Sequence, residues 1–282
     1  MLPTFHPRLA AFDFSRTPLH WMPGDPQLTH TINVLHLLLP AGERWFVDVF
    51  KDALPHVESP ELRRRMKAFM GQEEIHARAH EAIMNHLRGQ GLDPAPYLER
   101  LDWMFETLLA KQSRPFLSER AWLVRRLSIV AAIEHVTCVL ATWLLSNHQR
   151  LEARGADGAM LDCLKWHASE EVEHRRVAYE VLQALGASGW HRAAAMAIVF
   201  PVLTGIWARG TSTLMRLDPT APGRATWTRF ARHGLDGTLP TFPGITAAIA
   251  RYLKPGHDPH DENAVWPLAR AFLRDYEGRL AA

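Results

Sequence analysis

The stretch PELRRRMKAFMGQEEIHARAHEAIMNHLRG, residues 60–89, decides the fold class. Ser59 precedes it as a favourable N-cap, Pro60 suits the first helical position, and Gly89 and Gly91 can end a helix. One set of residues recurs at alternating steps of four and three, the spacing of one helix face: Leu62, Met66, Phe69, Glu73, His76, His80, Ile83 and Leu87. The pattern predicts a long amphipathic helix whose buried face carries Glu73 and His76.

A second stretch, residues 159–185, repeats this arrangement with Glu171 and His174. Its apolar face reads Met160, Leu164, His167, Glu171, His174, Ala178, Val181 and Leu185. Two more helices are predicted to carry one glutamate each. One opens at Pro40, after an apolar turn or helix at 32–39, and holds Glu43; the other begins near Ser118 and holds Glu134.

The order of these residues repeats along the chain. A glutamate is followed by Glu-x-x-His, then by a long connection with a helix at 94–114, and then by the same pair of elements. Two helical hairpins in this order predict an all-α, ferritin-like four-helix bundle with a dinuclear metal centre.

The rest of the chain is predicted to surround this bundle. Residues 1–26 form an irregular arm, residues 27–188 the metal-binding bundle, and residues 189–282 a helical extension packed on it within one domain. That extension is predicted to hold an apolar helix at 193–214, an irregular Pro/Gly-rich stretch at 218–244, a short helix at 245–253 and a terminal helix.

The four stripe glutamates predict a metal site because each replaces an apolar residue. A buried carboxylate costs several kcal/mol unless it is paired or bound to a metal, and none of these stripes carries Lys or Arg. About one Glu-x-x-His is expected by chance in such a chain, so the stripes and the partner glutamates carry the prediction. The predicted ligands are Glu43, Glu73, His76, Glu134, His167, Glu171 and His174.

Several neighbouring residues are given other roles. His167 lies one turn before Glu171, which makes it either a third histidine ligand or a hydrogen-bond partner of a carboxylate ligand. His80 lies on the stripe one turn after His76 and is predicted to support the ligands, with a ligand role as the alternative. His135 is also predicted to support the ligands, although it points about 100° away from Glu134. Glu74, Glu170 and Glu173 lie off the stripes and are predicted to face solvent.

Composition excludes several classes of protein. Lys+Arg 32 against Asp+Glu 30 is nearly balanced, and the surplus arginines are spread along the chain. A basic stripe with interleaved aromatic residues, which would indicate nucleic-acid binding, is not found. The apolar run 193–208 is shorter than the ~20 residues that span a bilayer, and the two cysteines fit a reducing compartment. A cytoplasmic protein without a membrane span is therefore predicted, with a homodimer left open. The sequence contains no G-x-S-x-G, P-loop or G-x-G-x-x-G motif.

The ligand pattern resembles that of the ferritin-like non-haem di-iron proteins, and His167 makes it similar to their arylamine N-oxygenase branch. In overall layout the chain also resembles the bacterial family named "predicted metal-dependent hydrolase". The first resemblance implies two iron ions, with manganese possible, bridged by Glu73 and by Glu171 or Glu134. It also implies O₂ as co-substrate, a small apolar or aromatic organic substrate and an electron-donor protein.

Three functions compete at this point. A carboxylate-rich ligand set in an apolar surround favours an O₂-activating oxygenase or oxidase. The alternative is a hydrolase in which a metal-bound hydroxide attacks an ester or amide. A metal or oxygen carrier is the third, although storage would favour a smaller chain. No catalytic residue beyond the metal ligands is predicted.

Overall fold

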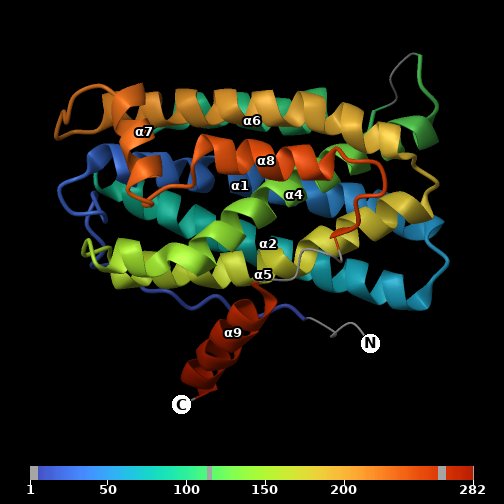
Figure 1. Cartoon of the computed structure of the whole chain (residues 1–282), viewed down its shortest axis with the longest axis horizontal. Helices are drawn as coiled ribbons and strands as arrows, with labels where there is room; N and C mark the ends of the chain where they lie inside the picture. Colours follow the sequence, from blue (N-terminus) through green and yellow to red (C-terminus); the bar gives the residue numbers. More distant parts are fainter. Residues whose placement is uncertain (1–5, 113–115, 260–264, 282) are drawn as a thin grey trace.

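The computed structural model describes residues 6–112, 116–259 and 265–281, and within them every regular element is helical. Four long helices form the core: α1 (Pro26–Ala53), α2 (Pro60–Gly89), α4 (Glu119–Glu152) and α5 (Gly158–Ala184). Helix α6 (Gly189–Leu217) lies over α1 and α4, whereas α9 (Trp266–Ala281) lies on the opposite side against α5 (Figure 1). The predicted all-α bundle is confirmed.

Helix α1 begins earlier than predicted. Asp25 caps it by accepting a hydrogen bond from the Leu28 amide at 3.1 Å, and Pro26 takes the first position. The prediction that a helix opens at Pro40 is wrong, because α1 continues through this proline. Pro40 leaves one carbonyl without its helical partner, and the cost of about 3 kcal/mol is offset by packing of α1 against α2 and α6.

The other three core helices match their sequence signals more closely. Ser59, Ser118 and Asp157 each accept a hydrogen bond from a backbone amide of the first turn and so cap α2, α4 and α5. Helix α4 continues to Glu152, although a turn was predicted from residue 147. The buried face of α4 continues through Leu151, which explains the extra turn.

The connections and the extension contain shorter elements. Helix α3 (Ala95–Trp103) passes into a π-helical turn at Met104–Leu108, so the single helix predicted at 94–114 is interrupted. Residues 113–115 lie outside the described part. Helices α7 (Trp227–Leu235) and α8 (Phe242–Tyr252) follow α6. Helix α7 falls in a stretch predicted to be irregular, where Thr226 caps it.

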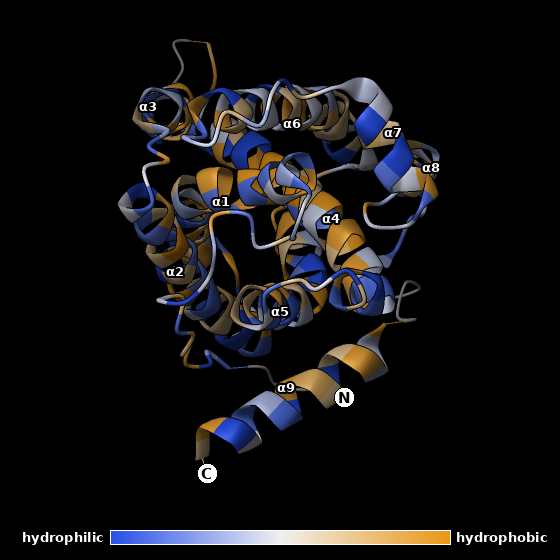
Figure 2. Cartoon of the chain, turned by 90° about the vertical axis from the view of Figure 1, so that its left-hand side faces the viewer, coloured by the Kyte–Doolittle hydropathy of each residue, from blue (hydrophilic) through white to orange (hydrophobic). Residues whose placement is uncertain are grey.

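The bundle interior is largely apolar, and its buried polar side chains lie around the four glutamates and at a few other places, such as His30, Asn33 and Arg126. Its largest fully buried side chains include Trp21, Phe50, Phe69 and Trp166. Figure 2 shows the four core helices end-on, with α6 above them and α9 below. Two helices, α4 and α6, are long and apolar enough to cross a membrane, but the apolar window of α4 is 67% buried inside the bundle. Helix α4 is therefore a core helix.

Candidate metal centre

The four core helices bring carboxylates and imidazoles together at the middle of the bundle. His174 Nδ1 lies 2.7 Å from Glu73 Oε1 and 3.4 Å from Glu171 Oε1. His76 Nδ1 lies 4.0 Å from Glu73 Oε2 and 3.8 Å from Glu171 Oε1. One donor atom from each of these four residues lies within 4.8 Å of the others, as ligands around one ion would. Both Glu-x-x-His pairs therefore point into one site.

The other ring nitrogen of each histidine is held by a hydrogen bond. His76 Nε2 lies 2.8 Å from Glu170 Oε2, and His174 Nε2 lies 2.8 Å from Gln72 Oε1. A ligating histidine commonly donates its second N–H to a carboxylate or carbonyl, which fixes the ring and leaves the other nitrogen for the metal. Both rings are thus oriented to ligate through Nδ1.

Glu43 and Glu134 complete the carboxylate set from α1 and α4. Both are almost fully buried, and neither side chain has a hydrogen-bond partner for either oxygen within the described residues. Burial and the neighbouring carboxylates Glu73 and Glu171 raise the pKa of both groups well above the usual range. Buried carboxylates without organic partners are what a bound cation would satisfy, so the residues fit a metal centre.

His167 also faces this cluster. Its Nε2 lies 3.1 Å from Glu171 Oε1, and its Nδ1 lies 3.9 Å from Glu43 Oε1. Burial alone would raise the pKa of Glu171, but His167 and His174 bring it well below its usual range. The opposite holds for His174. Burial alone would lower its pKa, but Glu73 and Glu171 raise the pKa of His174 well above its usual range. A proton and a metal ion therefore compete for the same donor atoms.

Two further histidines, His80 and His36, form a hydrogen-bonded chain with His167. His80 Nε2 lies 2.7 Å from His167 Nδ1, and His80 Nδ1 lies 2.7 Å from His36 Nδ1. With both of its nitrogens engaged by other rings, His80 orients His167. His36 was not singled out in the sequence, because its stretch was predicted to be a turn or helix without site residues.

The prediction that Glu170 and Glu173 face solvent is wrong, because both are buried. The Arg8 guanidinium enters from the N-terminal arm and lies 2.8 Å from Glu170 Oε1 and 3.1 Å from Glu173 Oε2. Burial alone would lower the pKa of Arg8, but Glu173 and Glu170 outweigh this effect and raise the pKa above its usual value. Gln72 Nε2 also donates to Glu173 at 3.0 Å. This network supports both Glu-x-x-His histidines, whereas Glu74 is exposed as predicted.

His135 is placed away from the cluster. Its Nε2 lies 3.3 Å from the Ala248 carbonyl oxygen, and its ring lies 4.4 Å from that of Tyr252. Both partners belong to α8, so the structure gives His135 a packing contact with the extension.

A second group of titratable side chains joins the arm to α1 and the end of α6. His20 Nε2 and His30 Nε2 lie 2.6 and 2.7 Å from Asp218 Oδ2. Trp21 donates to Asn33 Oδ1, which leaves the Asn33 amide nitrogen facing His30 Nδ1 at 3.5 Å. His30 therefore accepts at Nδ1 and donates from Nε2 to Asp218, which ties the arm to α1 and to the end of α6. Donor atoms of His20, His30 and Asp218 also lie close enough together to hold a metal ion.

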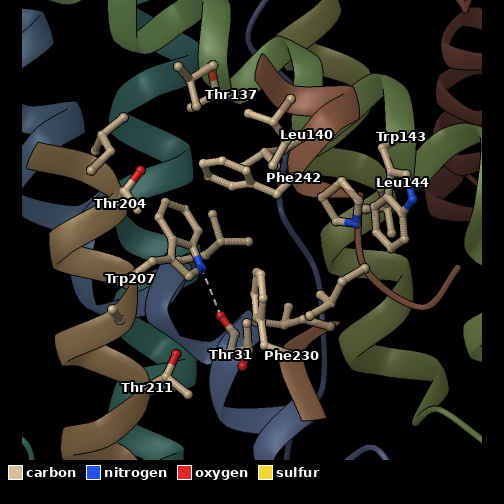
Figure 3. A pocket seen from close by; sticks show the side chains of 18 of the residues that line it. Thr31, Thr137, Leu140, Trp143, Leu144, Thr204, Trp207, Thr211, Phe230 and Phe242 are labelled. Carbon is tan, nitrogen blue, oxygen red and sulfur yellow. Dashed lines mark hydrogen bonds between the residues drawn. The ribbon is translucent and has the colours of Figure 1, made fainter. Parts of the chain in front are cut away.

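An apolar cavity of about 300 Å³ leads to the candidate centre. Figure 3 shows Leu140, Trp207, Phe230 and Phe242 around it, on α4, α6, α7 and α8. The lining also includes the buried side chains of His80, His167 and Glu171. Thr137, also in the wall, donates to Glu171 Oε2 at 2.5 Å. The cavity thus places an apolar ligand beside the candidate metal ligands.

Comparison with known proteins gives one clear result. The model of the family described as "Predicted metal-dependent hydrolase" matches residues 6–263, nearly the whole chain. No curated protein and no solved structure matches the chain. The family description agrees with the buried donor set, which is what a metal-dependent enzyme requires. The chain belongs to the predicted metal-dependent hydrolase family.

Proposed function

We propose that the chain hydrolyses an ester or amide bond in an apolar substrate, with two divalent metal ions held by Glu43, Glu73, His76, Glu134, His167, Glu171 and His174. The observation that carries this proposal is the apolar cavity, whose lining includes His167 and Glu171. The family description favours hydrolysis over the other reactions of such centres. When bound, the metal ions would supply Lewis-acid activation of the scissile carbonyl and of water.

The residues of the chain would position the substrate and the ligands. Cavity side chains such as Leu140 and Trp207 would hold the apolar part of the substrate and exclude bulk water. Gln72 and Glu170 hold the Nε2 atoms of His174 and His76, so both rings keep their orientation through a reaction cycle. His80 Nε2 lies 2.7 Å from His167 Nδ1 and would accept a hydrogen bond from it, which would keep the proton on that nitrogen of His167.

A second candidate is O₂-dependent oxidation of an apolar substrate by a di-iron or mixed manganese–iron centre. The observation that favours it is the donor set itself. Four carboxylates together with histidines form a donor set that suits iron or manganese. Catalytic zinc sites typically have a donor set richer in histidine. The apolar surround would exclude water from the centre during such a reaction. The proposed ferritin-like relationship belongs to this candidate.

Metal substitution separates the two reactions. Chain loaded with zinc or manganese under anaerobic conditions should hydrolyse p-nitrophenyl esters, with a preference for longer acyl groups. Leu140→Trp narrows the cavity and should reduce turnover of the longer esters about tenfold, while the exposed control Leu268→Trp in α9 leaves it unchanged. Turnover that requires both iron and O₂, with no ester hydrolysis under any metal, would instead establish the oxidation.

A further inference from the structure

The outer side of α6 is apolar and uncovered by the rest of the described chain. Residues 193–208 contain no charged side chain. Ile198 is 63% exposed and Val202 44%. The most apolar window of this helix is 28% buried, against 67% for α4. A helix of such composition normally hides its apolar surface, so this side of α6 needs a partner.

Helices α7 and α8 extend this surface beside α6 (Figure 2). Trp227 is 72% exposed, Leu235 88% and Phe242 52%. The Phe242 ring stacks against Phe200 of α6, with centroids 6.2 Å apart, which joins the start of α8 to α6. We call the combined surface the α6–α8 face; its members are Ala197, Ile198, Pro201, Val202, Gly205, Trp227, Leu235 and Phe242.

The same part of the chain is strongly basic. Residues 189–254 carry eight Lys and Arg residues and two acidic ones, whereas the whole chain is nearly balanced. Of the two acidic residues, Asp218 is buried and contacts His20 and His30, and Asp236 pairs with Arg154. The exposed positive charges on this side belong to Arg209, Arg216, Arg224, Arg229, Arg232, Arg251 and Lys254.

We propose that the α6–α8 face docks on an anionic lipid bilayer, with α6 lying in the plane of the interface. An apolar helix face flanked by basic residues binds at such an interface through buried apolar area and attraction to anionic headgroups. Tryptophan, here Trp227, is the residue enriched at that depth. The inner side of α6, including Leu203 and Leu214, stays in the protein core, so the helix rests on the bilayer without crossing it.

Charge argues against a second copy of the chain as the occupant. A two-fold dimer would place the same surface of each copy against the other. The basic excess of one copy would then face that of its partner, and like charges across an interface oppose association. An anionic surface neutralises the same residues.

Docking would also give the cavity a supply of apolar ligand. Thr204, Trp227 and Phe242 line the cavity and are also exposed, so the cavity reaches the surface at the α6–α8 face. An acyl or similar chain could then pass from the bilayer toward His167 and Glu171 without crossing water. This last step rests on the proposed function, whereas the docking does not.

Vesicle sedimentation tests the docking directly. The metal-loaded full chain is mixed with vesicles of phosphatidylcholine alone or with added phosphatidylserine. We expect binding to the phosphatidylserine vesicles to be about tenfold stronger and to weaken in high salt. Arg229→Glu with Arg232→Glu, and separately Ile198→Gln with Val202→Gln, should each weaken it by about tenfold.

Matched controls come from α9 on the opposite side of the molecule (Figure 1), where Arg270, Arg274 and Leu268 are also exposed. Arg270→Glu with Arg274→Glu, and Leu268→Gln, should bind like the unaltered chain. Equal binding by all variants, or no sedimentation with either vesicle, overturns the docking. So does a dimer in light scattering that Ile198→Gln with Val202→Gln dissociates. Binding is measured without substrate, so a chain that docks but hydrolyses nothing refutes only the proposed reaction.

Discussion

The Nε2 atom of His174 lies 2.8 Å from Oε1 of Gln72, and this contact turns the opposite ring nitrogen toward Glu73 at 2.7 Å. Gln72 also donates to Glu173, which Arg8 holds in place. The orientation of a candidate ligand on α5 thus depends on α2 and on the N-terminal arm.

Gln72→Leu removes the acceptor for His174 while keeping the size of the side chain. We expect metal affinity to fall by about 10- to 100-fold, because the ring loses the contact that sets its orientation. Calorimetric titration of Mn(II) into the metal-free protein measures this affinity. Gln149→Leu, on the exposed side of α4, is the control and should bind normally. Unchanged affinity in Gln72→Leu would show that His174 does not depend on this contact.

Glu134→Gln tests the electrostatics of the metal-free centre. Burial and Glu171 raise the pKa of Glu134, so the folded metal-free chain holds a proton that the unfolded chain releases above about pH 4.5. The contribution of Glu134 to the stability of the metal-free protein should therefore fall as pH rises from about 5 toward 8.

Glu134→Gln removes one such carboxylate. It should stabilise the metal-free protein at pH 8 by about 1–3 kcal/mol and reduce the further stabilisation by metal. Denaturant unfolding with and without Mn(II) gives both quantities. A variant that is less stable than the unaltered chain without metal would contradict the proposed strain among the carboxylates.

Arg8→Met tests the buried ion-pair network. Glu170 and Glu173 would keep their buried positions without their guanidinium partner, at a cost of about 3–5 kcal/mol. Adding Glu170→Gln and Glu173→Gln should recover much of this loss. If the single substitution leaves the urea midpoint unchanged, the arm does not hold the two glutamates.

His135 predicts a specific pH dependence of stability. Burial, helped by Arg175 and His257, lowers the pKa of His135 to about 3. At His135 the unfolded chain takes up a proton below about pH 6.5 that the folded chain does not, so the contribution of this residue to stability is lost as pH falls from there toward 3. His135→Gln can keep a donor for the Ala248 carbonyl and should flatten the dependence by up to about 1.4 kcal/mol per pH unit. Unfolding at pH 7, 6 and 5 checks the slope.

Local signals predicted the core helices well. Ser59 and Pro60 mark the start of α2 in the sequence and in the structure, and the four-three spacing places Glu73 and His76 on its buried face. Pro40 was misleading because it lies in the middle of α1, a helix that packs against α2 and α6. Such contacts involve residues far apart in the chain, which local preferences do not report.

The supporting residues of the centre were harder to predict. Glu170 was assigned to the surface because it lies off the stripe of α5, yet Arg8, 162 positions earlier, covers it. His36 contacts His80 through the part of α1 before Pro40, where no site residue was expected. The ligand pattern follows from helix periodicity, whereas these partners follow from how the arm and α1 pack on the bundle.

Metal content tests the central claim most directly. The purified chain is loaded anaerobically with Fe(II) or Mn(II), and excess metal is removed. Inductively coupled plasma mass spectrometry should then find about two metal ions per chain. Glu43→Ala with Glu134→Ala should hold at most one, while the exposed control Glu74→Ala keeps two. No bound metal in the unaltered chain, or two ions in the variant that lacks Glu43 and Glu134, would contradict the dinuclear centre.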